Sequence, residues 1–179
     1  REVIAEKVPG KNGQFNITTR FEKRPPIVGQ IGIYKGNFGY NRLCPAIHII
    51  KSANVNAFDI NVYHAGGMGL LAEKSADIHL NRFNVKLRPG TDRLVTTTAD
   101  ATHFCNVKGK LLIENCLFEN MLDDATNVHG TYVKAYEIKG KEVLARLNHM
   151  QQTGYEFGQA GDTLQVVDGQ TLLPKGTVI

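Results

Sequence analysis

The sequence predicts an all-β protein whose centre is a right-handed parallel β-helix. The first observation is a repeated phrase: residues 52–55 (Ser-Ala-Asn-Val) match residues 75–78 (Ser-Ala-Asp-Ile), 23 positions later. The second is the character of these phrases, which are short apolar runs separated by asparagines and glycines, as expected for short strands joined by tight bends. A repeat period in the low twenties, built from such strands, is typical of a β-helical solenoid.

Further copies extend the repeat along the chain. Residues 60–62 (Ile-Asn-Val) match residues 83–85 (Phe-Asn-Val) at the same spacing of 23. We align a third copy, residues 111–113 followed by Phe118, 35 positions after the second, and its extra residues fit an insertion at 88–93. Leucine-rich repeats have a similar period, but their Leu-x-x-Leu-x-Leu spacing is missing here.

Each turn of a solenoid buries its inward face against the neighbouring turns. The residues expected to point inward are Val55, Ile60, Val62, Ile78, Phe83, Val85, Ile113 and Phe118. Asparagines at equivalent bends are expected to stack, and these are Asn54, Asn61, Asn84, Asn115 and Asn120. We expect Gly66, Gly67 and Gly69 to serve a tight bend.

The chain divides into three expected segments. Residues 1–45 are predicted to form hairpins and irregular structure, 46–135 the β-helix, and 136–179 a small antiparallel or β-barrel-like segment. In the first segment, apolar and polar residues alternate over 14–19, which predicts a strand, and residues 27–34 are a second candidate strand. Near the C-terminus the expected strands are 132–138, 143–147, 163–167 and 171–173.

The composition narrows the class of partner. The chain has 179 residues, enough for one domain with a sizeable core, and a net charge of +4. Its basic residues are not clustered with aromatic side chains, so we predict no nucleic-acid partner.

No apolar run approaches the ~20 residues that a membrane-spanning helix needs. Because the chain starts at Arg1 without a signal-peptide pattern, we expect a segment of a longer protein. The sequence does not indicate an oligomeric state.

Three aspartates form the candidate site. Asp123 and Asp124 are adjacent, and Asp100 precedes the same Ala-Thr phrase as Asp124, 24 positions earlier. In successive turns, Asp100 would lie about one strand spacing, ~4.8 Å, from the pair. Like charges gathered on one wall repel each other and cost stability, so such clusters are more often chemical than structural. The alternative is that one acid caps a turn and the third is coincidental.

Three clustered carboxylates can hydrolyse a glycoside. One, held protonated, donates to the leaving oxygen, and the ionised ones activate a water molecule. A gap of ~6.5–9.5 Å between the carboxyl groups gives inversion, and a gap of ~5–5.5 Å gives retention. Repulsion within the cluster makes full ionisation costly, which separates acid from base.

Three strings in the chain resemble glycoside hydrolase family 110, the bacterial α-1,3-galactosidases. They are residues 63–69 (Tyr-His-Ala-Gly-Gly-Met-Gly), 97–104 (Thr-Thr-Ala-Asp-Ala-Thr-His-Phe) and 121–131 (Met-Leu-Asp-Asp-Ala-Thr-Asn-Val-His-Gly-Thr). Residues 152–157 resemble the family more weakly. An Asp-Asp motif alone is less specific, because polygalacturonases of the same β-helical type have a comparable trio of acids.

The resemblance implies a pectin-lyase-like β-helix with added small β-barrel domains, no metal and no other cofactor. It implies an exo-acting, inverting enzyme that removes terminal α-1,3-linked galactose from blood-group B type or linear glycans. The catalytic residues carried over are Asp100, Asp123 and Asp124. By analogy with polygalacturonases, Asp123 would be the general acid, and Asp100 and Asp124 would hold and deprotonate the water. Family members are several times longer than this chain. We therefore expect this piece to contain the site but to be inactive on its own.

Other polar residues are weaker candidates. His103, His129, Asn127, His64 and Arg93 are the expected contacts to galactose hydroxyls, although a lone histidine in a β-helix is more often structural. Glu73 is a candidate for orienting the sugar or the acids. Tyr63 and Tyr132 are candidate stacking platforms for a sugar face, with packing as the alternative role.

Two other functional classes remain open. A polygalacturonase or polysaccharide lyase would use the same scaffold, and a lyase would need calcium and a basic proton acceptor. A non-catalytic carbohydrate-binding β-helix would use the acids only to bind sugar hydroxyls. From the substrate class we expect a bacterial periplasmic, cell-surface or secreted location.

Overall fold

The computed structural model describes residues 3–19, 26–33, 35–36, 42–149 and 152–178, and its regular elements are β-strands. The predicted all-β class is therefore confirmed. Within these ranges, no helix has the length and apolar character needed to cross a membrane. Close contacts divide the chain into two compact units, residues 1–35 and 36–179.

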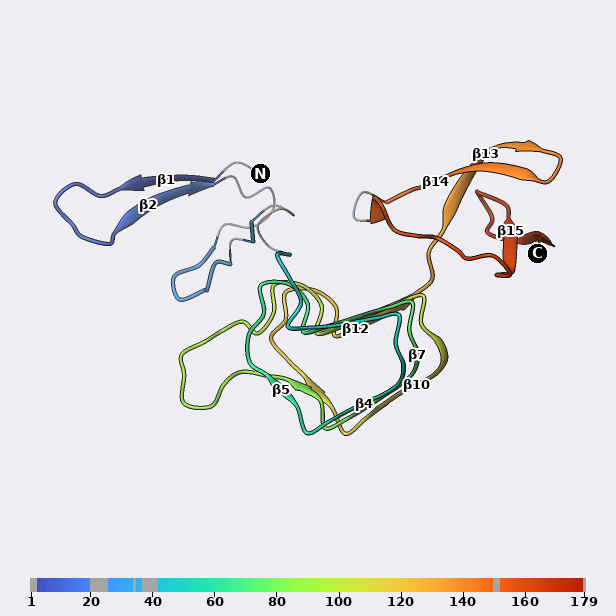
Figure 1. The fold of residues 1–179 in the computed structure, drawn as a ribbon. Coiled ribbons are helices and arrows are strands. Elements are labelled where there is room, and N and C mark those ends of the chain that lie inside the picture. The colour runs from blue at the N-terminus through green and yellow to red at the C-terminus, as the bar shows by residue number, and fades with distance from the viewer. Residues whose placement is uncertain (1–2, 20–25, 34, 37–41, 150–151, 179) are drawn as a thin grey trace. The chain divides into compact units, whose positions relative to one another are not determined.

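Parallel sheets form the centre of the second unit. In the described part of the chain, three successive turns each contribute one strand to each of three sheets, and a fourth turn begins. The first sheet holds β3 (Ile47–Ile50), β6 (Leu70–Glu73), β9 (Thr102–Cys105) and β12 (Thr126–His129). The second holds β4 (Ala53–Phe58), β7 (Ala76–Asn81) and β10 (Lys108–Glu114). The third holds β5 (Asn61–Val62), β8 (Asn84–Val85) and β11 (Leu117–Phe118). Figure 1 shows the turns following nearly the same course, which is compatible with the predicted β-helix.

The paired residues have the predicted spacing between the first two turns and a different spacing at the third. Asn61 pairs with Asn84 at the predicted spacing of 23. Phe118, however, pairs with Val85, and the spacing here is 33 instead of 35. The cause is that side chains alternate between faces with a period of two, so a slip of two residues keeps every apolar residue inward. The hydrophobic pattern therefore cannot distinguish the two alignments.

The core lies between the sheets and is most complete at the second turn. Every residue predicted to point inward does so: Val62, Ile78, Phe83 and Val85 belong to the buried cluster, and Val55, Ile60, Ile113 and Phe118 pack against it. Leu70, Ala72, Leu80, Ala101 and Phe104 complete the cluster, and all five are fully buried. The second turn is covered on both sides by neighbouring turns, which explains its burial.

The bends use asparagine in two ways. Asn84 Nδ2 donates to Asn61 Oδ1 at 3.1 Å, which confirms the predicted stacking for this pair. Asn54, Asn115 and Asn120 instead adopt left-handed backbone conformations, with φ of 56°, 54° and 58°. Asparagine tolerates this conformation better than most residues, which accounts for its frequency at these corners. The insertion at 88–93 is exposed and projects from the stack as a light-green loop (Figure 1).

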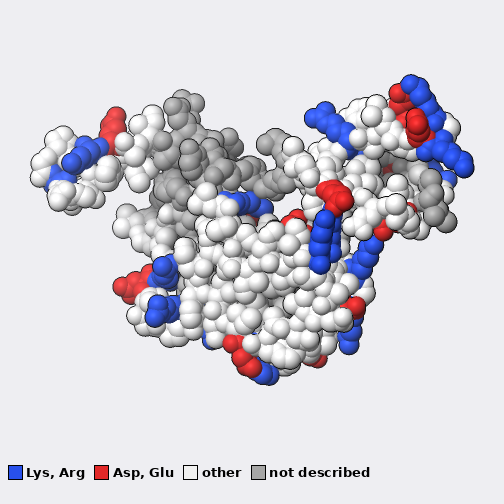
Figure 2. Space-filling view, in the orientation of Figure 1, with Lys and Arg blue, Asp and Glu red and all other residues white. Residues whose placement is uncertain are grey.

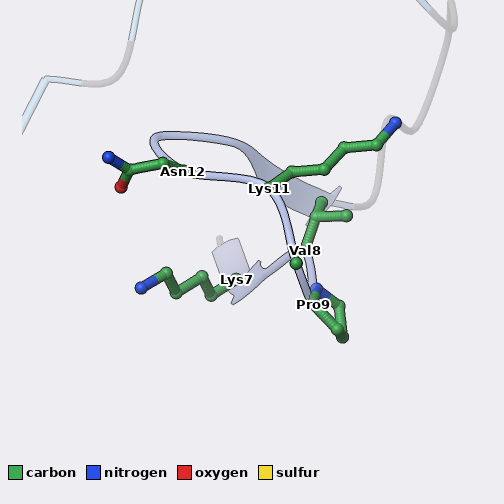
Figure 3. A pocket seen from close by; sticks show the side chains of 6 residues that line it. Lys7, Val8, Pro9, Lys11 and Asn12 are labelled. Atoms are coloured by element: carbon green, nitrogen blue, oxygen red, sulfur yellow. The ribbon is translucent and has the colours of Figure 1, made fainter.

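The remaining strands form antiparallel pairs. They are β1 (Val3–Lys7) with β2 (Phe15–Thr19), β13 (Val133–Lys139) with β14 (Glu142–Leu147), and β15 (Leu164–Val167) with β16 (Pro174–Val178). In the described part of the chain, the last four strands form two separate sheets. The hollow at the β1–β2 turn is lined by Lys7, Val8, Pro9, Gly10, Lys11 and Asn12. Figure 3 shows these side chains diverging, so they do not converge on a ligand.

Two predicted strands are wrong. Residues 27–33 form turns and irregular structure, because Ile27 and Gln30 bond to each other through main chain and side chain; Tyr34 lies outside the described residues. Residues 171–173 form a turn before β16. Asp168 Oδ1 accepts hydrogen bonds there from the main-chain nitrogens of Gln170 and Thr171, which is a competing local structure that aspartate favours.

Glycines allow adjacent turns to approach at the bend before β6. A Cβ atom on Gly67 would lie 2.5 Å from the carbonyl oxygen of Cys44, and one on Gly69 would lie 2.5 Å from that of Ala101. These distances are shorter than real Cβ contacts, so close approach of the backbone explains glycine at these two positions, whereas Gly66 meets only ordinary contacts. Because Ala101 follows Asp100, this approach also fixes the position of the candidate site.

We expect Gly69→Ala to lower the free energy of unfolding by about 1–3 kcal/mol, the range for overpacking a tight site. Gly66→Ala is the matched control, since its Cβ would meet only ordinary contacts at 3.9–4.0 Å. Urea denaturation of the two variants measures the difference. Equal stabilities of the two variants would contradict this account of the bend.

Candidate active site

Backbone register brings the three aspartates together. Asp100 and Asp124 each precede a strand of the first sheet by two residues, and Thr102 pairs with Thr126 at the start of those strands. The main-chain nitrogen of Ala101 donates to the carbonyl of Asp124 at 2.9 Å. Asp123 lies in the bend just before Asp124. One carboxylate oxygen from each of the three lies within 4.8 Å of the others. The expected cluster of acids is therefore present.

Asp100 is the buried member of the cluster, with 2% of its surface exposed. Its Oδ2 lies 2.6 Å from Nδ1 of His103. His103 follows by three residues on β9, where Phe104 points into the core, so His103 and Cys105 lie on the outer face of the sheet. The histidine thus holds one oxygen of a carboxylate that is shielded from water.

A second histidine continues this contact. His103 Nε2 lies 2.8 Å from Nε2 of His129, and the two rings meet edge to face with centroids 4.8 Å apart. His129 Nδ1 lies 2.7 Å from the carbonyl oxygen of Gly130. Both ring nitrogens of both histidines therefore have partners within the protein. Asn127 donates to Asp124 Oδ2 at 3.3 Å, so it too contacts an acid of the cluster.

Arg42 belongs to the site but was not predicted. Its Nη2 lies 2.5 Å from Oδ2 of Asp123, and 20% and 35% of the two side chains are exposed. Arg42 precedes a bend that is bonded to the next turn, since Leu43 donates to the carbonyl of Gly66. A single basic residue has no pattern that marks it. The one sequence feature that could have indicated Arg42 is its position a few residues before β3, the first strand of the first sheet.

The other predicted residues have different surroundings. His64 is exposed beside Ala65, and Arg93 is exposed on the insertion at 88–93. Glu73 pairs with His48 at 2.8 Å, at the opposite end of β6. The structure therefore brings His103, His129 and Asn127 to the aspartates and leaves these three residues outside the described network. Tyr63 is half-buried and Tyr132 is exposed.

A second polar cluster lies at the other end of the same strands. Glu156 forms ion pairs with Lys74 at 2.9 Å and Lys51 at 3.1 Å, and these lysines hold its pKa below the ordinary value. The Tyr155 hydroxyl contacts Cys105 Sγ and accepts a hydrogen bond from Asn106. Burial, followed by the bond to Cys105, raises the pKa of Tyr155. These contacts attach part of the weakly resembling string 152–157 to the first sheet.

The arrangement suits two kinds of chemistry. Three carboxylates this close can share protons unequally and act as acid and base. They can also supply oxygen ligands to a hard cation, although calcium takes about six to eight oxygens, more than one from each acid provides. On the face drawn in Figure 2, acidic and basic side chains are interspersed without a large patch of one sign.

The geometry defines a site of three carboxylates on parallel sheets. Several proteins of similar sequence share one name. The chain is 43% identical over 136 residues to "Alpha-1,3-galactosidase B" of Bacteroides fragilis (strain YCH46), covering 75% of this chain and 23% of that protein. It is 40% identical over 135 residues to the protein of that name from Parabacteroides distasonis, covering 74% and 22%. It is 37% identical over 139 residues to that from Akkermansia muciniphila, covering 77% and 18%. No protein-family model matches the chain.

These similarities confirm the resemblance to the α-1,3-galactosidases seen in the sequence, and they are consistent with glycoside hydrolase family 110. The chain spans about a fifth to a quarter of the length of these curated relatives.

We expect Arg42→Ala to lower the free energy of unfolding by about 1–2 kcal/mol, because it removes a cation from beside three clustered carboxylates. Arg82→Ala is the matched control. Arg82 pairs with Asp59 in a fully exposed position, where solvent screens the pair and its loss changes little. Denaturant titration compares the two variants, and a larger loss for Arg82→Ala would contradict the importance of the Arg42 contact.

Proposed function

We propose that this chain carries the catalytic centre of an exo-acting glycoside hydrolase that removes terminal α-1,3-linked galactose. The observation that carries the proposal is the cluster of Asp100, Asp123 and Asp124, whose oxygens lie within 4.8 Å of one another. It occurs in a chain 43% identical to a protein named for this activity. The substrate class includes blood-group B type and linear galactose-terminated glycans.

The scaffold we propose is a right-handed parallel β-helix over residues 46–135. An N-terminal hairpin segment (1–45) precedes it, and a small β-barrel-like segment (136–179) follows it. The stacked parallel sheets and the spacing of 23 between the first two turns support the helix. Because the proposed glycans occur outside the cytoplasm of bacteria, we propose a periplasmic, cell-surface or secreted location.

The reaction needs one protonated and one ionised carboxyl group. In the role assignment made by analogy with polygalacturonases, Asp123 donates to the leaving oxygen while Asp100 and Asp124 activate the water. The ion pair with Arg42 favours a different assignment, because a guanidinium is the partner of an ionised carboxylate. Asp124, which contacts the neutral amide of Asn127, is then the better donor.

The stereochemical course also has two candidates. The resemblance implies inversion without a metal. Retention is the alternative: a gap of about 5–5.5 Å between the carboxyl groups is typical of retaining enzymes, whereas inversion usually needs about 6.5–9.5 Å. These gaps refer to whole carboxyl groups, whereas the observed separation joins selected oxygens, so the product decides between the two.

We expect proton NMR of the full-length protein acting on a terminal α-1,3-galactoside to show β-galactose first, as inversion requires. Initial α-galactose would establish retention and would make one aspartate a nucleophile. The control is the same reaction in excess EDTA, where we expect an unchanged rate. Loss of activity on chelation, with unsaturated products absorbing in the ultraviolet, would favour the lyase alternative. Binding without cleavage would favour a carbohydrate-binding module.

Leaving-group dependence identifies the acid. The variant that lacks the proton donor should lose about 100-fold or more on a natural galactoside and far less on an aryl galactoside, whose leaving group needs no proton. We expect this selective rescue for Asp124→Asn and a loss on both substrates for Asp123→Asn. The reverse pattern would restore the assignment of Asp123 as acid, and equal losses in all three variants would contradict a single proton donor.

A further inference from the structure

Asp100, His103, His129 and the carbonyl of Gly130 form one continuous row. Its three contacts measure 2.6, 2.8 and 2.7 Å, all short enough for hydrogen bonds. Asp100 is almost fully buried, so water cannot easily replace its contact with His103. The row begins at the acid cluster and extends along the outer face of the first sheet to the end of β12.

Counting protons shows what this row requires. Each of its three hydrogen bonds needs one proton. Neutral His103 and His129 carry one ring N–H each, while an ionised Asp100 and the carbonyl of Gly130 carry none. Two protons cannot satisfy three hydrogen bonds. The complete row must therefore hold three protons, one more than two neutral imidazoles and an ionised carboxylate would supply. With that proton, the three side chains together have no net charge.

We propose that His103 is a positioning residue for Asp100, and that Asp100, His103 and His129 share three protons along the row, so that the three side chains together carry no net charge. The charged groups facing Asp100 explain why this matters. Asp123 and Asp124 approach it from the following turn, and Arg42 contacts the cluster through Asp123. An ionised Asp100 without this row would face at least one like charge, that of Asp123, in a buried place.

The consequence for the reaction is an acceptor held in one orientation. His103 fixes Oδ2, and the other oxygen of Asp100 meets the water or the substrate. Because the three side chains of the row together carry no net charge, the row offsets the repulsion that Asp100 would otherwise meet from the neighbouring acids. This inference rests on the proposed function, since only a reacting Asp100 gives the row a catalytic role.

The test has a spectroscopic arm and a kinetic arm, both on the full-length protein. In protein labelled with nitrogen-15 at histidine, we expect strongly downfield ring-proton resonances from the Asp100–His103 contact, absent in His103→Ala and in Asp100→Asn. In kinetics, His103→Ala should lower kcat about 100-fold with little change in KM, as expected for a misplaced reacting group. His103→Asn can place an amide N–H near the position of Nδ1, and it should recover about tenfold of that loss.

His79→Ala is the matched control, since His79 makes a similar 2.8 Å contact with Glu114 on the second sheet, away from the aspartates. It should keep the resonances and the wild-type kcat. A wild-type kcat for His103→Ala would overturn the proposal and leave the proposed function standing. If the wild-type protein has no glycosidase activity, the proposed function fails, and the resonances alone then test the row: their absence overturns it. If His103→Ala does not fold, the kcat of His103→Asn and the ring-proton resonances of the wild-type protein decide whether the proposal holds.

Discussion

The repulsion among three neighbouring carboxylates is the constraint on which the rest of the site depends. Their oxygens lie within 4.8 Å of one another, so none can be placed without regard to the other two. Each has a different partner: Asp100 has an imidazole, Asp123 a guanidinium and Asp124 a neutral amide. The three acids therefore lie in different electrostatic surroundings, as a division of work between acid and base requires.

Stacked turns supply those partners from distant parts of the sequence. Arg42 comes from the bend of the first turn, Asp100 and His103 from the third, and Asp123 from the fourth. Their meeting requires close approach of the bends, which depends on glycine at position 69, where a side chain would collide with Ala101. The spacing between turns and the electrostatics of the site therefore have a common cause in the backbone.

Much of this could be predicted from the sequence, for reasons that also explain the failures. The Asp-Ala-Thr phrase predicted the pairing of Thr102 with Thr126 because the same three residues lead into both strands. The third turn was misaligned by two residues because alternating side chains do not report such a slip. Arg42 was missed because its role comes from a neighbouring turn and not from a local motif. His103 and His129 were identified as candidates, but their contact with each other depends on a register that composition cannot give.

The outer face of the first sheet connects the acid cluster to the C-terminal segment. His103 and Cys105 alternate with core-facing Phe104 on β9, and His129 pairs in register with Cys105. Cys105 in turn contacts Tyr155, whose neighbour Glu156 is held by two lysines. Cys105 lies two residues after His103, whose ring contacts Asp100, and His129 contacts the same ring directly. The segment that resembles the family least strongly is therefore joined, through one strand, to the residues that resemble it most.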